Sequence, residues 1–136
     1  MTSTILAAAV IATAPIDEAR FLHSVALVES GNNPAAVNGN ARGAYQMKPP
    51  ARLDAARQLA AEGHPYPASA SDPVLASAYL RKLRRYLEQR GIKNPSPETL
   101  ALCWNQGAGG AARVGYAPND YARRVANLYR ASTRRN

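Results

Sequence analysis

The sequence predicts a mainly α-helical fold in a single domain. Its 136 residues suffice for one hydrophobic core but not for two, and 46% hydrophobic with 19% charged residues is typical of a globular chain. Apolar residues recur at helical spacing in several segments, and proline or acidic residues precede most of these segments. We therefore expect about five to seven helices and one small irregular loop or hairpin.

The balance of charge limits the classes of partner, and the single cysteine limits disulfides and metal sites. The net charge of +8 favours an anionic partner, and nucleic acid, an anionic membrane and an anionic cell wall all satisfy it. Cys103 is the only cysteine, so no intramolecular disulfide can form, and its apolar flanks predict a buried free thiol. His23 and His64 lack metal-ligand spacing, so we expect no metal site and no cofactor.

Residues 1–14 allow two interpretations. The apolar run 5–11 and the Ala-Thr-Ala that follows resemble a secretory signal, but no Lys or Arg precedes the run. The run is also shorter than the roughly 20 residues that span a bilayer, so no integral membrane segment is expected. We assign residues 1–14 to a signal-like segment or N-terminal arm, 15–130 to the folded domain and 131–136 to a basic flexible tail.

The first predicted helix begins at Asp17 and Glu18 and ends at Gly31. Its buried stripe follows helical spacing: Phe21, Val25 and Val28. Glu29 lies on the adjacent face at the C-terminal end, where the helix dipole and apolar neighbours both disfavour a charged carboxylate. We therefore expect a raised pKa, as a general acid needs, although a surface glutamate at a frayed end fits the local pattern too.

Residues 35–43 are rich in Asn and Gly and predict an ordered loop or short hairpin that forms the wall of a cleft. Pro49 and Pro50 suit the first turn of a second helix, which Gly63 ends. One side of that helix is apolar and is expected to be buried: Leu53, Ala56 and Ala60.

A third helix is predicted from Asp72, as N-cap, and Pro73 to Gly91. Its apolar stripe is Leu75, Tyr79, Leu83, Tyr86 and Leu87, and basic residues lie opposite: Arg81, Lys82, Arg84 and Arg85. A fourth helix starts at Ser96 and Pro97 and is expected to stop in a glycine-rich turn at 105–110. Asn119 and Asp120 can cap a last helix with its own stripe: Tyr121, Val125, Leu128 and Tyr129.

Four segments match one family's motifs in order. Residues 29–37 are similar to E-S-x-x-x-P-x-A, residues 41–47 to A-x-G-L-M-Q, residues 101–107 to A-A-Y-N-A-G, and Tyr121 to the tyrosine of a C-terminal helix. Across roughly residues 18–130 the chain thus resembles the soluble-type (SLT-domain) lytic transglycosylases, which have a lysozyme-like fold. The resemblance implies a catalytic domain that cleaves the β-1,4 bond between N-acetylmuramic acid and N-acetylglucosamine and leaves a 1,6-anhydro end.

By the same resemblance, Glu29 is the single catalytic residue, first acid and then base. Residues expected to bind substrate are Asn38, Tyr45, Gln46, Trp104, Asn105 and Tyr121. Asn38 and Gln46 would donate hydrogen bonds to the sugar, Tyr45 and Trp104 would form flat walls, and Tyr121 would orient Glu29. In this chain Tyr45 replaces the family's usual Met, Trp104 its Tyr and Asn38 its common Ser, which affects fine substrate choice.

No second acid is expected beside Glu29. Residues 30–53 contain no Asp or Glu, and Asp54, Glu62 and Glu88 are interpreted as exposed-face residues. A hydrolytic muramidase using Glu29, a non-catalytic cell-wall glycan-binding domain and a basic nucleic-acid binder remain as alternatives. We favour peptidoglycan strands as the partner, no nucleic acid, a monomer, and a place in the cell envelope, periplasmic or secreted, or in phage-associated lysis.

Overall fold

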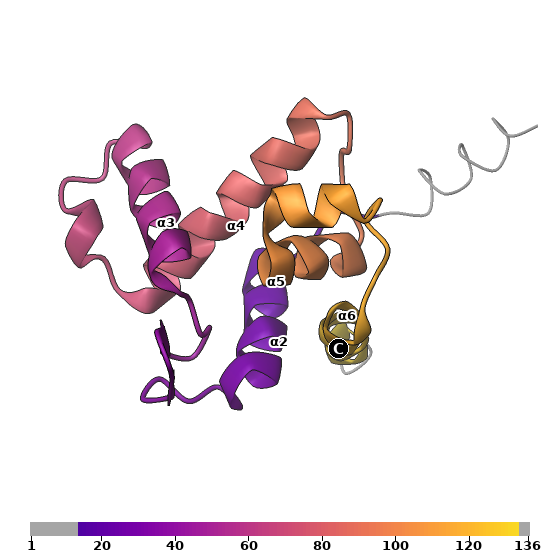
Figure 1. Ribbon diagram of the computed structural model, residues 1–136, viewed down its shortest axis with the longest axis horizontal. Coiled ribbons are helices and arrows are strands. Elements are labelled where there is room, and N and C mark those ends of the chain that lie inside the picture. The colour runs from indigo at the N-terminus through magenta and orange to yellow at the C-terminus, as the bar shows by residue number, and fades with distance from the viewer. Residues whose placement is uncertain (1–13, 134–136) are drawn as a thin grey trace, which may run out of the picture.

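The computed structural model describes residues 14–133 and confirms a mainly helical chain, with five α-helices and a two-stranded sheet in that range (Figure 1). The elements are α2 (Glu18–Ser30), β1 (Val37–Asn38), β2 (Ala41–Arg42), α3 (Pro49–Ala61), the 3-10 turn η1 (Pro67–Ser69), α4 (Asp72–Gln89), α5 (Pro97–Arg113) and α6 (Asp120–Thr133). The signal-like segment expected at 1–14 lies, apart from Ala14, outside the described residues. None of the helices between residues 14 and 133 is both long and apolar enough to cross a membrane.

The helices divide into two groups that a long helix connects. Figure 1 shows α3 and η1 on one side, α5 and α6 on the other, and α4 running diagonally between them above α2. In the hairpin, Val37 pairs with Arg42 and Asn38 with Ala41 in antiparallel register. Of the two forms expected for residues 35–43, an ordered loop or a short hairpin, the structure has the hairpin. This arrangement brings the hairpin and α3 opposite α2 and α5.

The core lies mainly between α2, α4, α5 and α6. Its largest fully buried side chains are Phe21, Val25, Leu80, Leu87, Leu100, Leu102, Cys103 and Val125. The stripes predicted for the first and third helices are largely confirmed, although Val28 and Tyr86 are only partly buried. Burial raises the pKa of the Cys103 thiol to about 11, which keeps this free cysteine protonated and unreactive.

Local capping signals were mostly interpreted correctly. The Asp17 carboxylate accepts from the Arg20 backbone N–H at 3.0 Å, and Ser96 Oγ accepts from the Thr99 N–H at 3.1 Å. The expected cap at Asp72 is wrong, because Ser71 is the N-cap and Asp72 follows it inside the helix. A guanidinium offers a carboxylate two charge-assisted hydrogen bonds, so Asp72 binds an arginine rather than the helix end.

The buried face of α3 differs from the expected one. Leu53 is 51% exposed and Ala60 is exposed, whereas Ala55 and Leu59 are buried against α4. Two apolar stripes run along this helix at similar spacing, and Ala51, Ala55 and Leu59 form the second. The second stripe packs on α4. In this orientation of α3, Arg52 also reaches Asp72 of α4.

The two remaining boundary predictions need correction. Only Gly107 is non-helical within the glycine-rich segment, with φ 76° and ψ 156°, and the chain is helical on both sides of it. Glycine adopts this backbone conformation without a Cβ clash, so a single residue makes the bend. The helix α6 extends to Thr133, so residues 131–133 of the expected flexible tail are helical, while 134–136 lie outside the described residues.

Candidate active site

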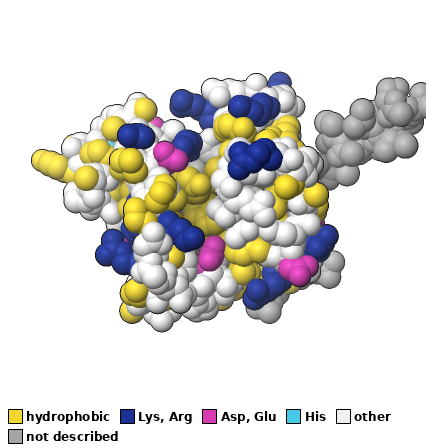
Figure 2. Space-filling view, viewed as in Figure 1, with side chains coloured by type: hydrophobic (Ala, Val, Ile, Leu, Met, Phe, Trp, Pro, Cys, Tyr) yellow, Lys and Arg dark blue, Asp and Glu magenta, His cyan; other side chains and the backbone are white. Residues whose placement is uncertain are grey.

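A cleft of about 730 Å³ lies between the hairpin and α3 on one side and α2 and α5 on the other. Figure 2 shows apolar surface at the centre of this hollow, with basic and acidic side chains beside it. Five of the seven predicted site residues line it: Glu29, Asn38, Gln46, Trp104 and Asn105. Its size falls within the range of pockets that hold small ligands, so a segment of a polymer can fit.

Glu29 stands near the C-terminal end of α2 with its carboxyl half-buried at the cleft. Burial is the largest influence on its pKa and raises it above the ordinary value. A hydrogen bond from Tyr121 and the positive charge of Lys48 lower the pKa, but less than burial raises it. The expected raised pKa of Glu29 is therefore confirmed, and it keeps a larger fraction of the carboxyl protonated at a given pH.

Tyr121 holds Glu29 from the protein side. Its hydroxyl donates to Glu29 Oε2 at 2.8 Å across 92 residues of sequence. Burial, and then the nearby Glu29 charge, raise the pKa of Tyr121 far above its usual value, so the hydroxyl remains a donor. Tyr121 does not line the cleft, so the structure favours its predicted orienting role over direct contact with a substrate.

Two aromatic rings, Trp104 and Tyr79, form one wall of the cleft. The Trp104 and Tyr79 rings meet edge to face with centroids 5.0 Å apart, and both line the cleft. Tyr45 lies 6.5 Å from Trp104 and does not line the cleft, so its predicted place on the wall is not supported. Sequence reasoning placed Tyr79 in the core stripe, although a tyrosine among leucines signals a ring with one polar edge.

Gln46 organises the hairpin. Its Nε2 donates to the carbonyls of Gly43 at 2.9 Å and Ala36 at 3.2 Å, and its Oε1 accepts from Asn38 Nδ2 at 3.2 Å. Both amide protons are thus engaged within the protein, while the side chain still lines the cleft, so a role of Gln46 as donor to sugar stays a prediction. These bonds also hold Gln46 in a left-handed conformation, with φ 50°. Asn38 retains one N–H for a ligand.

A serine connects this loop to the helix that carries the acid. Ser30, next to Glu29, donates from its hydroxyl to the Ala44 carbonyl at 2.7 Å and accepts from the Asn33 N–H at 3.0 Å. On the other side of the cleft, Asn105 accepts from Asn119 Nδ2 at 3.1 Å. Ser30 therefore joins the end of the helix that carries Glu29 to the loop segments at Asn33 and Ala44, and Asn119 holds the side chain of Asn105.

Two charged cleft residues were missed by the sequence analysis. Asp54 was interpreted as an exposed-face residue, but it lines the cleft and its carboxylate lies 2.6 Å from Lys82 Nζ. Lys48, the N-cap residue of α3, also lines the cleft. The signal for Asp54 was its place beside the buried Ala55 on α3, which only the correct choice of buried face reveals.

Searches of protein-family models, curated proteins and solved structures found no match to this chain. The likeness to SLT domains and to the lysozyme-like fold therefore stays a prediction from sequence motifs. Function has to be inferred from the chemistry of the cleft, since the same fold can carry unrelated activities.

Proposed function

We propose that the protein is a peptidoglycan lytic transglycosylase that cleaves the β-1,4 bond between N-acetylmuramic acid and N-acetylglucosamine. The observation that carries this proposal is the half-buried Glu29 carboxyl, held by Tyr121 beside an aromatic wall in the cleft. Such a substrate places the protein in the cell envelope or in phage-associated lysis.

Glu29 acts first as a general acid. Its Oε2 accepts from Tyr121, while Oε1 has no hydrogen-bond partner among residues 14–133 and is free to carry the proton. The proton passes to the glycosidic oxygen as the bond from that oxygen to C1 of the muramic residue breaks. The N-acetylglucosamine side leaves with a hydroxyl group, and positive charge develops at C1.

The same residue then acts as a base. The Glu29 carboxylate takes the proton from the C6 hydroxyl of the muramic residue while that oxygen bonds to C1, which forms the 1,6-anhydro ring. Glu29 ends protonated again and no water is consumed. The Tyr121 hydrogen bond stabilises the carboxylate between the two steps.

The cleft walls suit a chain of acetylated sugars. Trp104 and Tyr79 offer apolar surface against which the C–H face of a pyranose ring can pack. The free N–H of Asn38 and the side chain of Asn105 offer polar contacts to hydroxyl or acetamido groups.

A hydrolytic muramidase is the second candidate, and Asp54 is the observation that favours it. Hydrolysis with inversion uses a second carboxylate to activate water, and Asp54 is a second carboxylate in the same cleft as Glu29. In the transglycosylase Asp54 would have no chemical role. The two candidates therefore differ in the product and in the effect of Asp54→Asn.

The test is digestion of purified peptidoglycan by the wild type, Glu29→Gln and Asp54→Asn, with the products identified by mass. We expect 1,6-anhydro ends, which are lighter than reducing ends by one water, a loss of about 10² to 10⁴ in rate for Glu29→Gln, and little change for Asp54→Asn. Reducing ends alone, with loss of activity in Asp54→Asn, would establish the muramidase. Binding to peptidoglycan without cleavage would indicate a glycan-binding domain.

The Glu29→Gln variant is expected to fold. Because burial raises the pKa of Glu29 in the folded state, stability is lost as pH rises from 4.5 through the raised value. A neutral amide avoids that cost and can still accept from Tyr121. A melting temperature at neutral pH no lower than that of the wild type is the control for the activity assay.

A further inference from the structure

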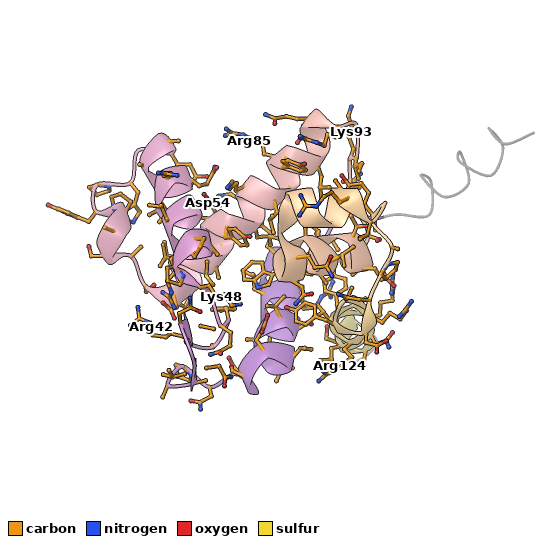
Figure 3. All side chains as sticks on the ribbon, in the orientation of Figure 1. Arg42, Lys48, Asp54, Arg85, Lys93 and Arg124 are labelled. Carbon is orange, nitrogen blue, oxygen red and sulfur yellow. The ribbon has the colours of Figure 1, made fainter. Side chains whose placement is uncertain are left out.

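The charge of Lys48 in the cleft is balanced only while Glu29 is ionised. Within residues 14–133 the charged lining of the cleft consists of Glu29, Lys48 and Asp54, and Asp54 is paired with Lys82 at 2.6 Å. In the same range Lys48 forms no hydrogen bond or ion pair through its side chain. In Figure 3, Lys48 lies between the start of α3 and α2, whereas Asp54 lies further along α3 toward α4.

The backbone that carries Lys48 is well anchored. Its carbonyl accepts from the Arg52 N–H at 3.0 Å, and Arg52 Nε donates to the Met47 carbonyl at 3.0 Å. Pro49 and Pro50 follow at once and restrict the backbone further. The ammonium therefore moves only by side-chain rotation from a fixed position on the cleft wall.

A general acid must be protonated before the reaction, and a protonated Glu29 leaves Lys48 as an unmatched positive charge in the cleft. A glycan chain that covers the cleft takes Lys48 partly out of water. Removing an ammonium from water without an opposite charge is unfavourable, and a neutral sugar chain supplies no such charge. A substrate with an anionic group beside the scissile bond removes this cost.

We propose that Lys48 binds a carboxylate of the substrate next to the scissile bond and so selects anionic glycan strands over neutral ones. This inference rests on the proposed function. The carboxylate has two sources: the lactyl ether of a muramic residue that lacks a peptide, or the stem peptide attached to it.

The same contact affects the acid. The positive charge of Lys48 lowers the pKa of Glu29, and a bound carboxylate neutralises that charge. Among residues 14–133, the other charged or titratable groups around Glu29 are Tyr121 of α6, on which Arg124 acts, and Asp54 across the cleft, and the cleft residues of α5 are uncharged. An anionic substrate therefore raises the pKa of Glu29 and favours its protonated form.

The experiment compares Lys48→Met and Lys48→Arg on peptide-bearing and peptide-free strands, each with native carboxylates or with carboxylates converted to methylamides. On the low-pH plateau, Lys48→Met should lower kcat/KM about tenfold or more on native strands, mainly through KM, and little on amidated ones. Lys48→Arg keeps the charge and should retain most activity. Lys93→Met, in the connection between α4 and α5 and away from the cleft, is the matched control (Figure 3).

The substrate arms separate the two sources. Dependence on Lys48 that appears only with peptide-free strands assigns the lactyl carboxylate, and dependence with peptide-bearing strands assigns the stem peptide. On amidated strands the alkaline limb of kcat/KM should move to higher pH in Lys48→Met, because the charge that lowers the pKa of Glu29 is gone. Equal losses on native and amidated strands, or no loss on either, would overturn the inference.

A binding measurement tests the role of Lys48 separately from the proposed transglycosylase activity. Dissociation constants for native and amidated strands are compared between Glu29→Gln and the Glu29→Gln, Lys48→Met double variant, neither of which needs to react. Preference for native strands that depends on Lys48 supports the inference even if the products are reducing ends. Absence of that preference overturns it even if anhydro ends form.

Discussion

The two sides of the cleft are stabilised differently. On the side of α2, α5 and α6, large apolar residues such as Phe21, Leu102 and Val125 are fully buried. On the hairpin side, the only buried residues of α3 are Ala55 and Leu59. The first side therefore draws its stability mainly from the hydrophobic effect, which scales with the apolar area removed from water.

Polar links hold the hairpin side. The Arg52 guanidinium reaches the Asp72 carboxylate at 2.8 and 3.1 Å and the Arg42 carbonyl at 2.8 Å, which joins β2, α3 and α4. Arg81 of α4 binds Glu62, just after α3, through two bonds of 2.7 Å. The acid Glu29 thus lies on the apolar side, and the wall facing it depends on charges that respond to solvent conditions.

The largest effect is expected from a cavity on the apolar side. Phe21 is fully buried in α2 and meets Tyr129 edge to face at 6.4 Å, so Phe21→Ala should lower the free energy of unfolding by about 3–5 kcal/mol. Urea unfolding measures it. Leu27→Ala, at a position 39% exposed in the same helix, should cost under about 1 kcal/mol. Similar losses for both would remove the contrast between buried and exposed positions.

The next largest effect on stability tests the ion pair between Arg52 and Asp72 on the hairpin side of the cleft. Gly43 has φ 85°, and an added Cβ would overlap the Asp72 carboxylate, whereas Gly39 has φ 58° and open space around it. Both Gly→Ala changes impose left-handed strain of about 1–2 kcal/mol, and Gly43→Ala should cost about 1 kcal/mol more because it displaces the ion pair with Arg52. Thermal unfolding of both variants measures this difference. Equal costs would show that the link contributes nothing.

A smaller effect, on the rate, is expected from loss of the hydrogen bond between Tyr121 and Glu29. Tyr121→Phe removes the hydrogen bond to Glu29, so we expect about a tenfold loss in kcat on peptidoglycan. Because that bond lowers the pKa of Glu29, its loss should also move the alkaline limb of the pH profile to higher pH. Tyr66→Phe, at a position 73% exposed, is the control. An unchanged pH profile would argue against the positioning role.

The smallest effect should come from the exposed ion pair. Arg81 is the main reason that the pKa of Glu62 is lowered from 4.5 to about 2. Solvent screens this pair, so Arg81→Met should cost less than about 1 kcal/mol, and less still at high salt. The pair contributes above pH 4.5, and its contribution is lost as pH falls through about 2. Arg57→Met, at an exposed position of α3, should show no such pH dependence.

The elements themselves were largely predictable because their signals are local. Asp17, Gly31 and Ser96 act on backbone groups within a few residues, so their roles do not depend on the rest of the chain. The buried face of α3 was not predictable, because two apolar stripes compete and only α4 decides between them. The error over Asp72 has the same origin, since its partner Arg52 lies 20 residues away.

The candidate site divides in the same way. The sequence by itself determined that Glu29 lies near the end of the first helix, that a polar loop or hairpin follows, and that Trp104 comes just before a glycine-rich break in a later helix. The resemblance predicted that Tyr121 orients Glu29, and the structure adds the 2.8 Å hydrogen bond between them. Only the tertiary structure decided that Tyr79 joins Trp104 and that Lys48 and Asp54 share the cleft. The physical reason is that the pKa of a carboxyl depends on burial and on nearby charges, which distant segments supply when the chain folds.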